Sequence, residues 1–476
     1  MNNYSATTWF LIALAVGAIC LGYLVAVSPD TGLGFVVGTV PVVVTVSLIS
    51  REKDDRAFLL RLYLITLCVR CALAVFIYSE SLQPFFGGDA ETYDIAGYAL
   101  SRAWSGFGQA DSPWMVRYTS PGTSGWGMYY FVASIYHIAG HSQLVVQSIN
   151  CALGAAACVV VYKIMRLIHP SQRVARTAAM LTGFSPSMIL WSSQLLKDAP
   201  IVLCLCLCTM YTLKLRSRVA VKDFLLLLLS LFCLFSLRHY AFYIMFIAIA
   251  GTLLLAAKRV TPLRVVQGGI LIIAIGMVLV YFGAGQTVQN GFDLKRIQAA
   301  REWGAREAKT GFGGDVDITD PKAAIGFLPI GTLYVLFAPF PWMVTNLRQL
   351  ITLPELLTWW ALVPILVTGF WHAVRHRLKE SFALCVFTVG LTLAYALYQS
   401  DVGTAYRHRG QLYIFFFIFI SLGLEVKRAA RQKRRSNLST GYPFFAPLAT
   451  ATGPDAVSNN SIGGHLLRAP ERIDAR

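Results

Sequence analysis

The sequence predicts an all-α integral membrane protein with about 12 transmembrane helices. Of its 476 residues, 56% are hydrophobic and only 14% are charged, and the mean hydropathy is +0.58. Such a composition excludes an ordinary soluble domain. The chain also contains repeated apolar runs of about 20 residues, the length that crosses a bilayer as a helix. Its basic residues collect in the short connectors between these runs, which is typical of multi-pass membrane proteins.

Twelve apolar runs form the predicted spans. They cover residues 8–28, 33–50, 57–79, 142–162, 177–194, 198–213, 221–238, 240–257, 264–284, 353–372, 380–398 and 407–425. The first run has no Lys or Arg in its N-terminal flank and no clear cleavage site, so we expect a retained helix rather than a cleaved signal peptide. Pro186 is expected to kink the fifth run, because proline cannot continue the helical hydrogen-bond pattern.

The net charge of +17 comes mainly from the connectors, at residues 51–56, 163–176, 214–218, 258–264, 375–379 and 427–435. Basic connectors mark the cytoplasmic side of a membrane. With 12 spans and both termini in the cytoplasm, all of these clusters fall on that side. The distribution favours a plasma (inner) membrane protein whose charged partners are anionic membrane lipids, and it argues against a nucleic-acid partner.

This topology leaves two long outer segments, at about residues 80–141 and 286–352. The charge pattern predicts amphipathic helices in both of them. Counting the apolar stretches 126–139 or 325–346 as further spans would break the agreement with the basic connectors. Both stretches are therefore expected to be surface or re-entrant segments. Because the polar residues that fit lipid least gather on this side, we expect a polar site that faces outward, toward the periplasm.

Two parts make up the predicted domain organisation. Residues 1–425 form the polytopic membrane domain, in which no internal repeat or independent soluble domain is visible. Residues 426–476 are expected to form a cytoplasmic tail that is first basic and then disordered. Disorder is expected from Ser436 onward, where Ser, Asn, Gly, Pro and Thr dominate the sequence.

Three carboxylates, those of Asp89, Glu91 and Asp94, lie within six residues of the first outer segment. A carboxylate near an acceptor hydroxyl can remove its proton as a general base, so Asp89 is a candidate catalytic residue. Glu91 and Asp94 are candidates to orient that base or to bind a divalent metal ion. The alternative is a helix start, with Asp89 as the N-cap and acidic residues in the first turn. The residues by themselves leave both interpretations open.

Cations on the predicted outer side are candidate ligands for a phosphate. Lys197 lies in a tight turn between two spans, and Arg407 and Arg409 open the last span, where topology requires no positive charge. Arg238 and His239 raise the same question at another outer turn. Arginine binds phosphate with a planar fork and lysine binds it as a point charge. The alternatives are a snorkelling lysine and arginines that contact lipid headgroups.

The sequence indicates no disulfide framework, and its metal content stays unknown. All ten cysteines lie in apolar runs, and Cys204, Cys206 and Cys208 alternate, so they do not share a helical face. Core packing explains them better than metal binding. Asp315 and Asp317 resemble the Asp-x-Asp of soluble nucleotide-sugar transferases, but they are predicted to lie outside, where nucleotide sugars are absent. A divalent metal at the acidic cluster is the one cofactor left open.

Three segments resemble the C-type (GT-C) glycosyltransferases, polytopic enzymes that use polyprenyl-phosphate-linked sugars and include protein mannosyltransferases and aminoarabinose transferases. They are residues 88–96 (GDAETYDIA), 185–198, and 406–409 (YRHR). In that family the first outer loop carries an acid, usually Asp followed directly by Glu, that serves as a base or binds metal. The resemblance implies this role for Asp89. An alanine separates the two acids in this chain, which departs from the family pattern.

The resemblance implies a membrane glycosyltransferase that moves a sugar from a polyprenyl-phosphate-linked donor to a glycan, lipid or protein acceptor outside the cytoplasm. Asp89 would act as the base, with inversion at the anomeric carbon, and outer Lys or Arg side chains would stabilise the departing phosphate. The alternative enzyme is an O-antigen-type polysaccharide polymerase or ligase, which fits the arginines of the second outer segment but not the acidic first one. A flippase or transporter of lipid-linked sugars would need charged groups at mid-depth within its spans.

Overall fold

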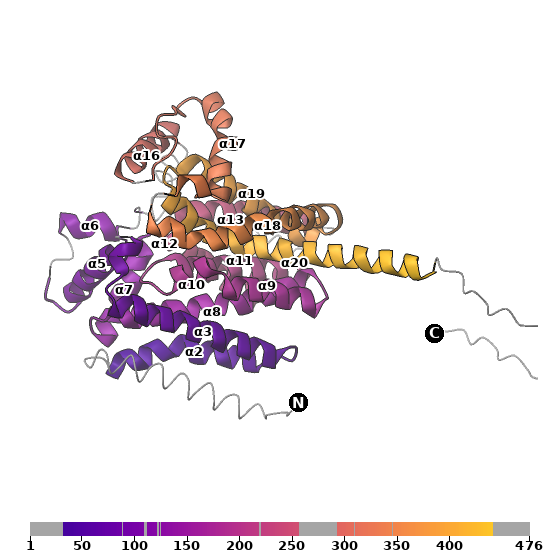
Figure 1. The fold of residues 1–476 in the computed structure, drawn as a ribbon. Helices are drawn as coiled ribbons and strands as arrows, with labels where there is room; N and C mark the ends of the chain where they lie inside the picture. The colour runs from indigo at the N-terminus through magenta and orange to yellow at the C-terminus, as the bar shows by residue number, and fades with distance from the viewer. Residues whose placement is uncertain are drawn as a thin grey trace, which may run out of the picture. The chain divides into compact units, whose positions relative to one another are not determined.

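The architecture is helical throughout the part of the chain that the computed structural model describes. That part comprises residues 32–256, without 88, 109–111, 121–122, 124 and 219, and residues 293–440, without 309 and 345. Within these ranges there is no β-strand, and the isolated β-bridge that is present joins Gly311 to Asp401. The chain divides into two units, Met1–Arg428 and Ala429–Arg476, and the helix bundle belongs to the first (Figure 1).

The helices differ widely in length and follow one another through short connectors. They are α2 (Gly32–Ser50), α3 (Arg56–Ser79), α4 (Gln83–Phe86), α5 (Asp89–Trp104), α6 (Pro113–Thr119), α7 (Trp126–Ala139), α8 (Gln143–Ile168), α9 (Gln172–Phe184), α10 (Pro186–Ser192), α11 (Asp198–Ser217), α12 (Val221–Leu237), α13 (His239–Ala256), α16 (Leu294–Glu307), α17 (Pro321–Phe337), the 3₁₀ turn Pro341–Met343, α18 (Leu347–His376), α19 (Leu378–Tyr398) and α20 (Val402–Thr440).

Within the described residues, five helices are long and apolar enough to cross a membrane: α3, α8, α11, α18 and α19. They coincide with predicted spans and make the chain a multi-pass membrane protein. Helices α2 and α13 contain shorter apolar stretches, α12 has 17 residues, and the last predicted span lies within α20. The predicted spans 8–28 and 264–284 lie outside the described residues, so the number of 12 stays a prediction.

The fifth predicted span, 177–194, is not one continuous helix. It consists of α9 and α10, which are separated at Ser185. Ser185 is extended (φ −65°, ψ 123°), as expected for a residue that precedes proline, and Pro186 is the first residue of α10. The kink predicted at Pro186 is therefore a full break, and the backbone groups freed there need partners from other helices.

The two apolar stretches inside the predicted outer segments are short helices. Residues 126–139 correspond to α7, and the stretch 325–346 contains most of α17 followed by the 3₁₀ turn. Neither reaches the 18 residues used as the shortest spanning length. Helix α7 is largely enclosed, since Met128, Val132 and Ala133 are buried where it packs on α5 and its neighbours. It therefore supports α5 from within the fold.

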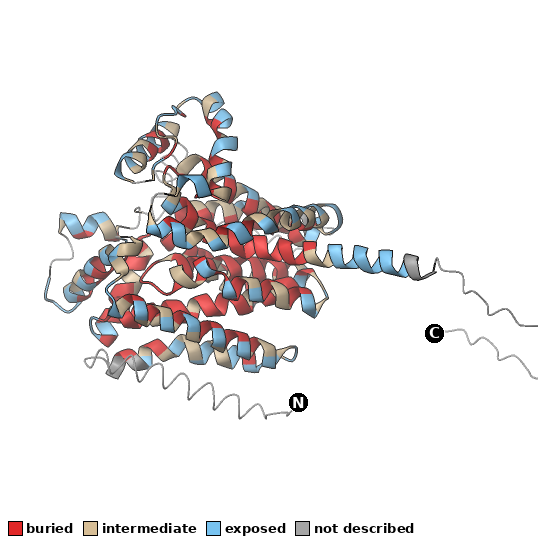
Figure 2. Ribbon diagram, viewed as in Figure 1, coloured by how far each residue is buried: buried red, intermediate tan, exposed pale blue. Residues whose placement is uncertain are grey.

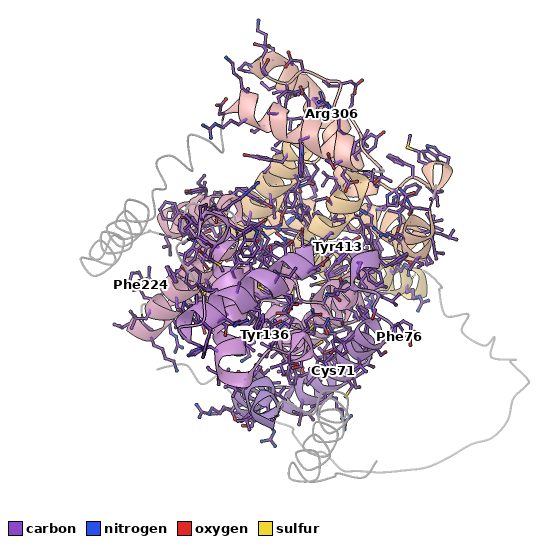
Figure 3. All side chains as sticks on the ribbon, turned by 90° about the vertical axis from the view of Figure 1, so that its left-hand side faces the viewer. Cys71, Phe76, Tyr136, Phe224, Arg306 and Tyr413 are labelled. Carbon is purple, nitrogen blue, oxygen red and sulfur yellow. The ribbon has the colours of Figure 1, made fainter. Side chains whose placement is uncertain are left out.

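The core of the bundle is built around α8. In its apolar stretch 89% of residues are buried, compared with 11% in α18, most of whose residues are exposed or half-buried, as expected for contact with lipid (Figure 2). Figure 3 looks along the bundle from the end that carries α5 and α16, and Tyr413 of α20 lies among the packed helices. Helices α18 and α20 touch backbone to backbone, because a Cβ on Gly369 would lie 1.8 Å from the Phe419 carbonyl oxygen.

Four of the basic connectors lie together at one end of the bundle, as their predicted location on one side of the membrane requires. The contacts that join them are Lys163–Glu52 (2.5 Å), Arg176–Asp55, Arg216–Glu380 (2.9 Å) and a hydrogen bond from Arg377 to the Ile168 carbonyl oxygen (2.8 Å). In Figure 1 the opposite end carries α5, α6 and α16. Of the two remaining connectors, 258–264 lies outside the described residues and 427–435 lies near the end of α20.

Helix α20 extends beyond the predicted last span and ends at Thr440. Residues 436–440, which the composition assigns to a disordered tail, are therefore helical. Extending an existing helix avoids the cost of nucleation, so a polar sequence can continue a helix that packing has already formed. The predicted disorder of 441–476 lies outside the described residues.

Candidate active site

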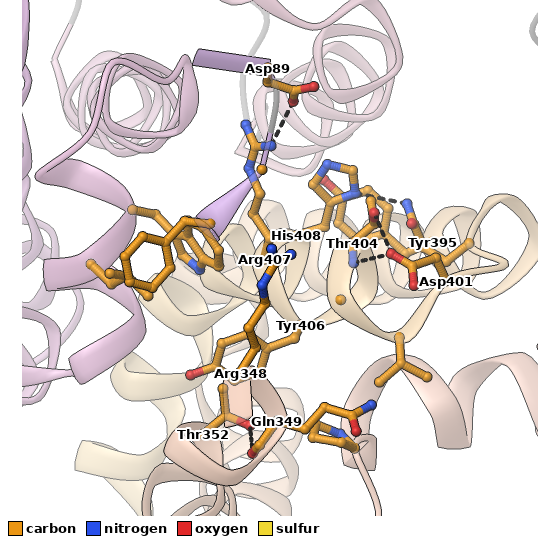
Figure 4. Close-up of a pocket in the computed structure, with 18 of the residues that line it drawn as sticks. Asp89, Arg348, Gln349, Thr352, Tyr395, Asp401, Thr404, Tyr406, Arg407 and His408 are labelled. Carbon is orange, nitrogen blue, oxygen red and sulfur yellow. Dashed lines mark hydrogen bonds and ion pairs between the residues drawn. The ribbon is translucent and has the colours of Figure 1, made fainter. Parts of the chain in front are cut away.

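A cavity of about 610 Å³ lies where α4, α5, α10, α13, α18, α19 and α20 converge (Figure 4). It brings together four of the predicted site residues: Asp89, Lys197, Arg238 and Arg407. They come from the start of α5, the turn before α11, the turn before α13 and the first turns of α20. The cavity therefore combines the exposed Asp89 carboxylate with these three cations at one end of an apolar bundle, and Arg348 and Asp401 line it as well.

Arg407 is the centre of this arrangement. Its Nη1 donates to Asp89 Oδ2 at 2.6 Å, an interaction drawn in Figure 4, and its Nε donates to Asp198 Oδ2 at 2.8 Å. The two partners differ in burial, since the Asp198 side chain is 6% exposed and the Asp89 side chain is 57% exposed. Asp198 therefore holds the guanidinium in place, whereas Asp89 is the partner that a ligand can replace.

Arg238 is buried behind Arg407 and is fixed by two contacts. Its Nη1 donates to the Tyr395 hydroxyl at 3.1 Å, and its Nη2 lies 3.1 Å from His408 Nε2. A guanidinium can only donate, so His408 accepts at Nε2. Its Nδ1 lies 2.8 Å from Gln399 Nε2, so both ring nitrogens are engaged and Nε2 is not free to act as a base.

Lys197 reaches the cavity without an anionic partner. In the described part of the chain its Nζ forms no hydrogen bond or ion pair, and it lies 5.9 Å from the centre of the Tyr93 ring. Gly125 leaves room for it, because a Cβ at that position would lie 2.6 Å from Nζ. Burial, and secondarily the charges of Arg238 and Arg407, lower the pKa of Lys197 to about 7. An anion bound here would supply the missing partner.

Two of the three predicted acids do not line the cavity. Glu91 is exposed, and Asp94 is buried on the other side of α5. Asp94 accepts hydrogen bonds from the Tyr136 hydroxyl and from Gln143 Nε2 (2.7 Å), and it lies 2.9 Å from His141 Nε2. Burial raises the pKa of Asp94, but these hydrogen bonds outweigh it and keep the pKa below its usual range. Asp94 joins α5 to α7 and α8.

Two of the predicted phosphate ligands also lie elsewhere. Arg409 is fully buried and donates to the carbonyl oxygens of Val335 (2.7 Å) and Ala338, which stabilises the C-terminal end of α17. It points away from Arg407 because residues two apart on a helix are separated by about 200°. His239 is buried against the Phe235 ring, 4.7 Å between centroids, and does not line the cavity.

Several residues of the site were not among the sequence candidates. Asp198, next to Lys197 in the chain, holds Arg407 from one side, and Trp191 supports Arg407, whose guanidinium carbon lies 5.8 Å from the centre of the Trp191 ring. Tyr240 and Tyr398 stack at 6.1 Å along one wall. Glu355 is an acid inside a predicted span. That position is itself a signal, because ionisable residues inside spans are costly and usually functional.

A metal does not fit the acidic side of this cavity. Within the described residues, no group of three or more His, Cys, Asp or Glu side chains could hold an ion. Asp89 faces the guanidinium of Arg407, which would repel a divalent cation. None of the nine described cysteines forms a disulfide.

Residues 125–282 match the family model described as dolichyl-phosphate-mannose-protein mannosyltransferase, which confirms the predicted resemblance to C-type glycosyltransferases. Among solved structures, the chain is similar to the oligosaccharyltransferase of Archaeoglobus fulgidus in its apo form, with a TM-score of 0.45 and 14% sequence identity. The similarity covers 82% of this chain and 52% of that protein, so the chain spans about half of its length. No curated protein matches the chain.

Proposed function

We propose that this chain is a membrane glycosyltransferase that moves a sugar from a polyprenyl-phosphate-linked donor to a glycan, lipid or protein acceptor. The observation that carries the proposal is the meeting of Asp89 with Lys197, Arg238 and Arg407 in one cavity at the end of an apolar helix bundle. The family match over residues 125–282 supports the same class of activity.

Three cationic side chains suit the phosphate of a lipid-linked donor. Arg407 offers a planar fork, Lys197 has a charge without an anionic partner, and Arg238 adds a buried positive charge behind them. The apolar side chains of the surrounding helices suit the polyprenyl chain. The donor phosphate would take the place of Asp89 on Arg407, while the buried Asp198 keeps the guanidinium in position.

The proposed reaction is a single displacement. The acceptor hydroxyl oxygen forms a bond to the anomeric carbon as the bond between that carbon and the donor phosphate oxygen breaks. The hydroxyl proton passes to Asp89, which the phosphate has released from Arg407, and the bonding electrons leave with the lipid phosphate. Arg407, Arg238 and Lys197 stabilise the charge that develops on this phosphate. Attack opposite the departing group inverts the anomeric configuration.

The three arginines on α16 give little support to the alternative polymerase or ligase, although Arg348 of the same outer segment lines the cavity. On α16, Arg296 lies 3.7 Å from Asp293 and Arg306 lies 3.6 Å from Glu302, so both face acids of their own helix. Arg301 is fully buried. These three side chains are not among the residues that line the cavity, so the transferase is the preferred function.

We also infer that the cavity faces the periplasm or exterior, because the joined basic connectors lie at the other end of the bundle. Single cysteines in a Cys-less version test this orientation. Asp315→Cys should react with an impermeant thiol reagent in intact cells, and Arg375→Cys should react only after permeabilisation, since both positions are exposed. The opposite labelling pattern would reverse the topology and move the cavity to the cytoplasm.

The proposed activity is tested with purified protein in lipid nanodiscs. The parent should bind a short-chain polyprenyl-phosphate sugar and release its labelled sugar to an acceptor fraction. Arg407→Gln should bind the donor about 100-fold more weakly, because a charged, bidentate contact is lost. Arg375→Gln, which removes an arginine at the opposite end, is the matched control and should bind as the parent does. Equal donor binding by parent, Arg407→Gln and Arg375→Gln would refute the assignment.

A further inference from the structure

Glu355 is a carboxylate inside α18, within a helix that qualifies as a membrane span. Four hydrogen bonds satisfy it. Oε1 accepts from the hydroxyls of Ser185 and Ser187, both at 2.8 Å, and Oε2 accepts from the Ser187 backbone N–H at 3.0 Å and from the Tyr406 hydroxyl at 2.5 Å. In the described part of the chain no Lys, Arg or His pairs with it. The desolvation of a carboxylate inside a membrane span is costly, so its presence there indicates a structural or functional role.

The first role of Glu355 concerns the break between α9 and α10. Ser185 and Ser187 flank Pro186, and the N–H of Ser187 belongs to the first turn of α10, where backbone donors lack intrahelical partners. Glu355 accepts that N–H and both hydroxyls from a different helix. Its negative charge also interacts favourably with the N-terminal end of α10. The direction of α10 is thus set by α18.

The second role of Glu355 concerns the aromatic side chains near Arg407. Helix α10 contains Trp191, and the Trp191 and Tyr406 rings meet edge to face with centroids 6.5 Å apart. The guanidinium carbon of Arg407 lies 5.8 Å from the centre of the Trp191 ring. Glu355 holds Tyr406 directly and Trp191 through α10. The Trp191 ring beside Arg407 and the Tyr406 ring that meets it therefore both depend on one carboxylate.

We propose that Glu355 is a positioning residue for Arg407. It fixes Tyr406 and the start of α10, and these two elements hold the guanidinium where it meets the donor phosphate. The inference rests on the proposed function, since it assigns Arg407 to that phosphate. Glu355 does not line the phosphate cavity and has no direct part in the reaction.

A rival role for Glu355 follows from a second cavity. A crevice of about 300 Å³, lined by apolar side chains such as Phe184, Trp359 and Phe417, has Glu355 on its wall. In the rival role Glu355 shapes the crevice for a hydrocarbon chain. The two roles differ in what they do to a lipid that lacks a phosphate, because only the positioning role depends on the charge of the headgroup.

The test compares two probes, a short-chain polyprenyl phosphate and the polyprenol of the same chain length, bound to the full-length protein in nanodiscs. Glu355→Gln should weaken binding of the phosphate about tenfold, because hydrogen bonds to a charged acceptor are lost, and it should leave polyprenol binding unchanged. Tyr406→Phe removes a single donor to Glu355 and should act in the same direction. The double variant Glu355→Gln/Tyr406→Phe should weaken phosphate binding no more than the worse single variant does, since both changes act through one set of contacts.

Thr368→Ala is the matched control, because it removes a hydroxyl from the same helix that bonds only to the Pro364 carbonyl oxygen. An equal loss for phosphate and polyprenol, or unchanged phosphate binding by Glu355→Gln, would overturn the proposal. If Glu355→Gln does not fold, Tyr406→Phe decides by the same comparison. A parent that binds both probes equally would refute the proposed function itself, whereas a parent that prefers the phosphate, with the preference retained in Glu355→Gln, would refute only the role of Glu355.

Discussion

The Asp198 carboxylate and the Arg407 guanidinium form a buried ion pair, with 2.7 Å between Oδ2 and Nη2, although 209 residues separate them in the chain. Asp198 begins α11 and Arg407 lies in the first turns of α20. The pair therefore ties two helices together at the wall of the cavity. Because Asp198 is nearly inaccessible, it gives Arg407 a fixed position that does not depend on Asp89.

Asp198→Asn should destabilise the protein by about 3 kcal/mol, the lower end of the range for breaking a buried pair, because Arg407 then keeps only the exposed Asp89 as an anionic partner. Thermal unfolding in detergent measures the change. The double variant Asp198→Asn/Arg407→Gln should recover part of the loss, since neither charge then remains. If the two single losses simply add, the ion pair is not what stabilises this contact.

Asp89→Asn keeps the shape of the side chain and removes the proposed base. Turnover should fall about 10²–10⁴-fold, while folding and membrane insertion stay normal. Glu91→Gln is the control, because Glu91 is exposed and does not line the cavity. Sugar transfer at the parental rate by Asp89→Asn would leave this residue as the first residue of α5 and nothing more.

Arg407 and Arg409, which the sequence treats alike, should respond differently to the same change. Arg407→Lys keeps the charge but loses the planar fork, so donor affinity should fall about tenfold with little change in thermal stability. Arg409→Lys should lower the unfolding temperature, because the Val335 and Ala338 carbonyl oxygens lose donors, and donor affinity should change less. Titration of the donor and thermal scans of both variants give the comparison. An equal loss of donor affinity in Arg407→Lys and Arg409→Lys would mean that Arg409 also binds the phosphate.

Donor affinity should decrease as the pH rises through about 7. The pKa of Lys197 is lowered to about 7, so the side chain is an ammonium below that pH and a neutral amine above it. A polyprenyl-phosphate sugar is the right probe, because its phosphodiester keeps one negative charge throughout. Lys197→Met should bind weakly at every pH and should lack the step. If donor affinity of Lys197→Met still falls as the pH rises through about 7, a group other than Lys197 causes the pH dependence.

Asp94→Asn should lower stability by about 2–4 kcal/mol and leave the chemistry intact. The amide nitrogen that replaces one carboxylate oxygen cannot accept from Tyr136 or Gln143, so buried donors lose their partner. Because the folded pKa is lowered, this contribution is complete at neutral pH. It is lost only as the pH falls below the ordinary carboxyl pKa of about 3.9. Thermal unfolding measured beside transfer separates the two effects.

Hydropathy was sufficient to predict the class of protein and the place of its long helices. The predicted spans 57–79, 142–162 and 380–398 coincide closely with α3, α8 and α19. This works because a membrane helix satisfies its own backbone hydrogen bonds and the bilayer sets its length, so local composition decides. Pro186 marked the break between α9 and α10 for the same reason, since the effect of a proline on the helix is local.

Only the tertiary structure could show which of the candidate residues form the site. Residue type and the predicted outer side of the membrane made Asp89, Lys197, Arg238 and Arg407 candidate site residues, and these four meet in the cavity. The same two criteria also made candidates of acids and cations that do not line the cavity. The reason is direction: residues one or two positions apart on a helix point to different neighbours, as the separation of about 200° between positions 407 and 409 illustrates.

The sequence by itself determined an all-α membrane protein with the basic connectors at one end and the polar candidates at the other. Only the tertiary structure decided that Arg407 lies between Asp89 and Asp198, and that Glu355 supports its surroundings through Tyr406 and α10. These contacts join positions as far as 318 residues apart. No local pattern encodes such a pairing, because the free energy that brings the groups together comes from the packing of whole helices around them.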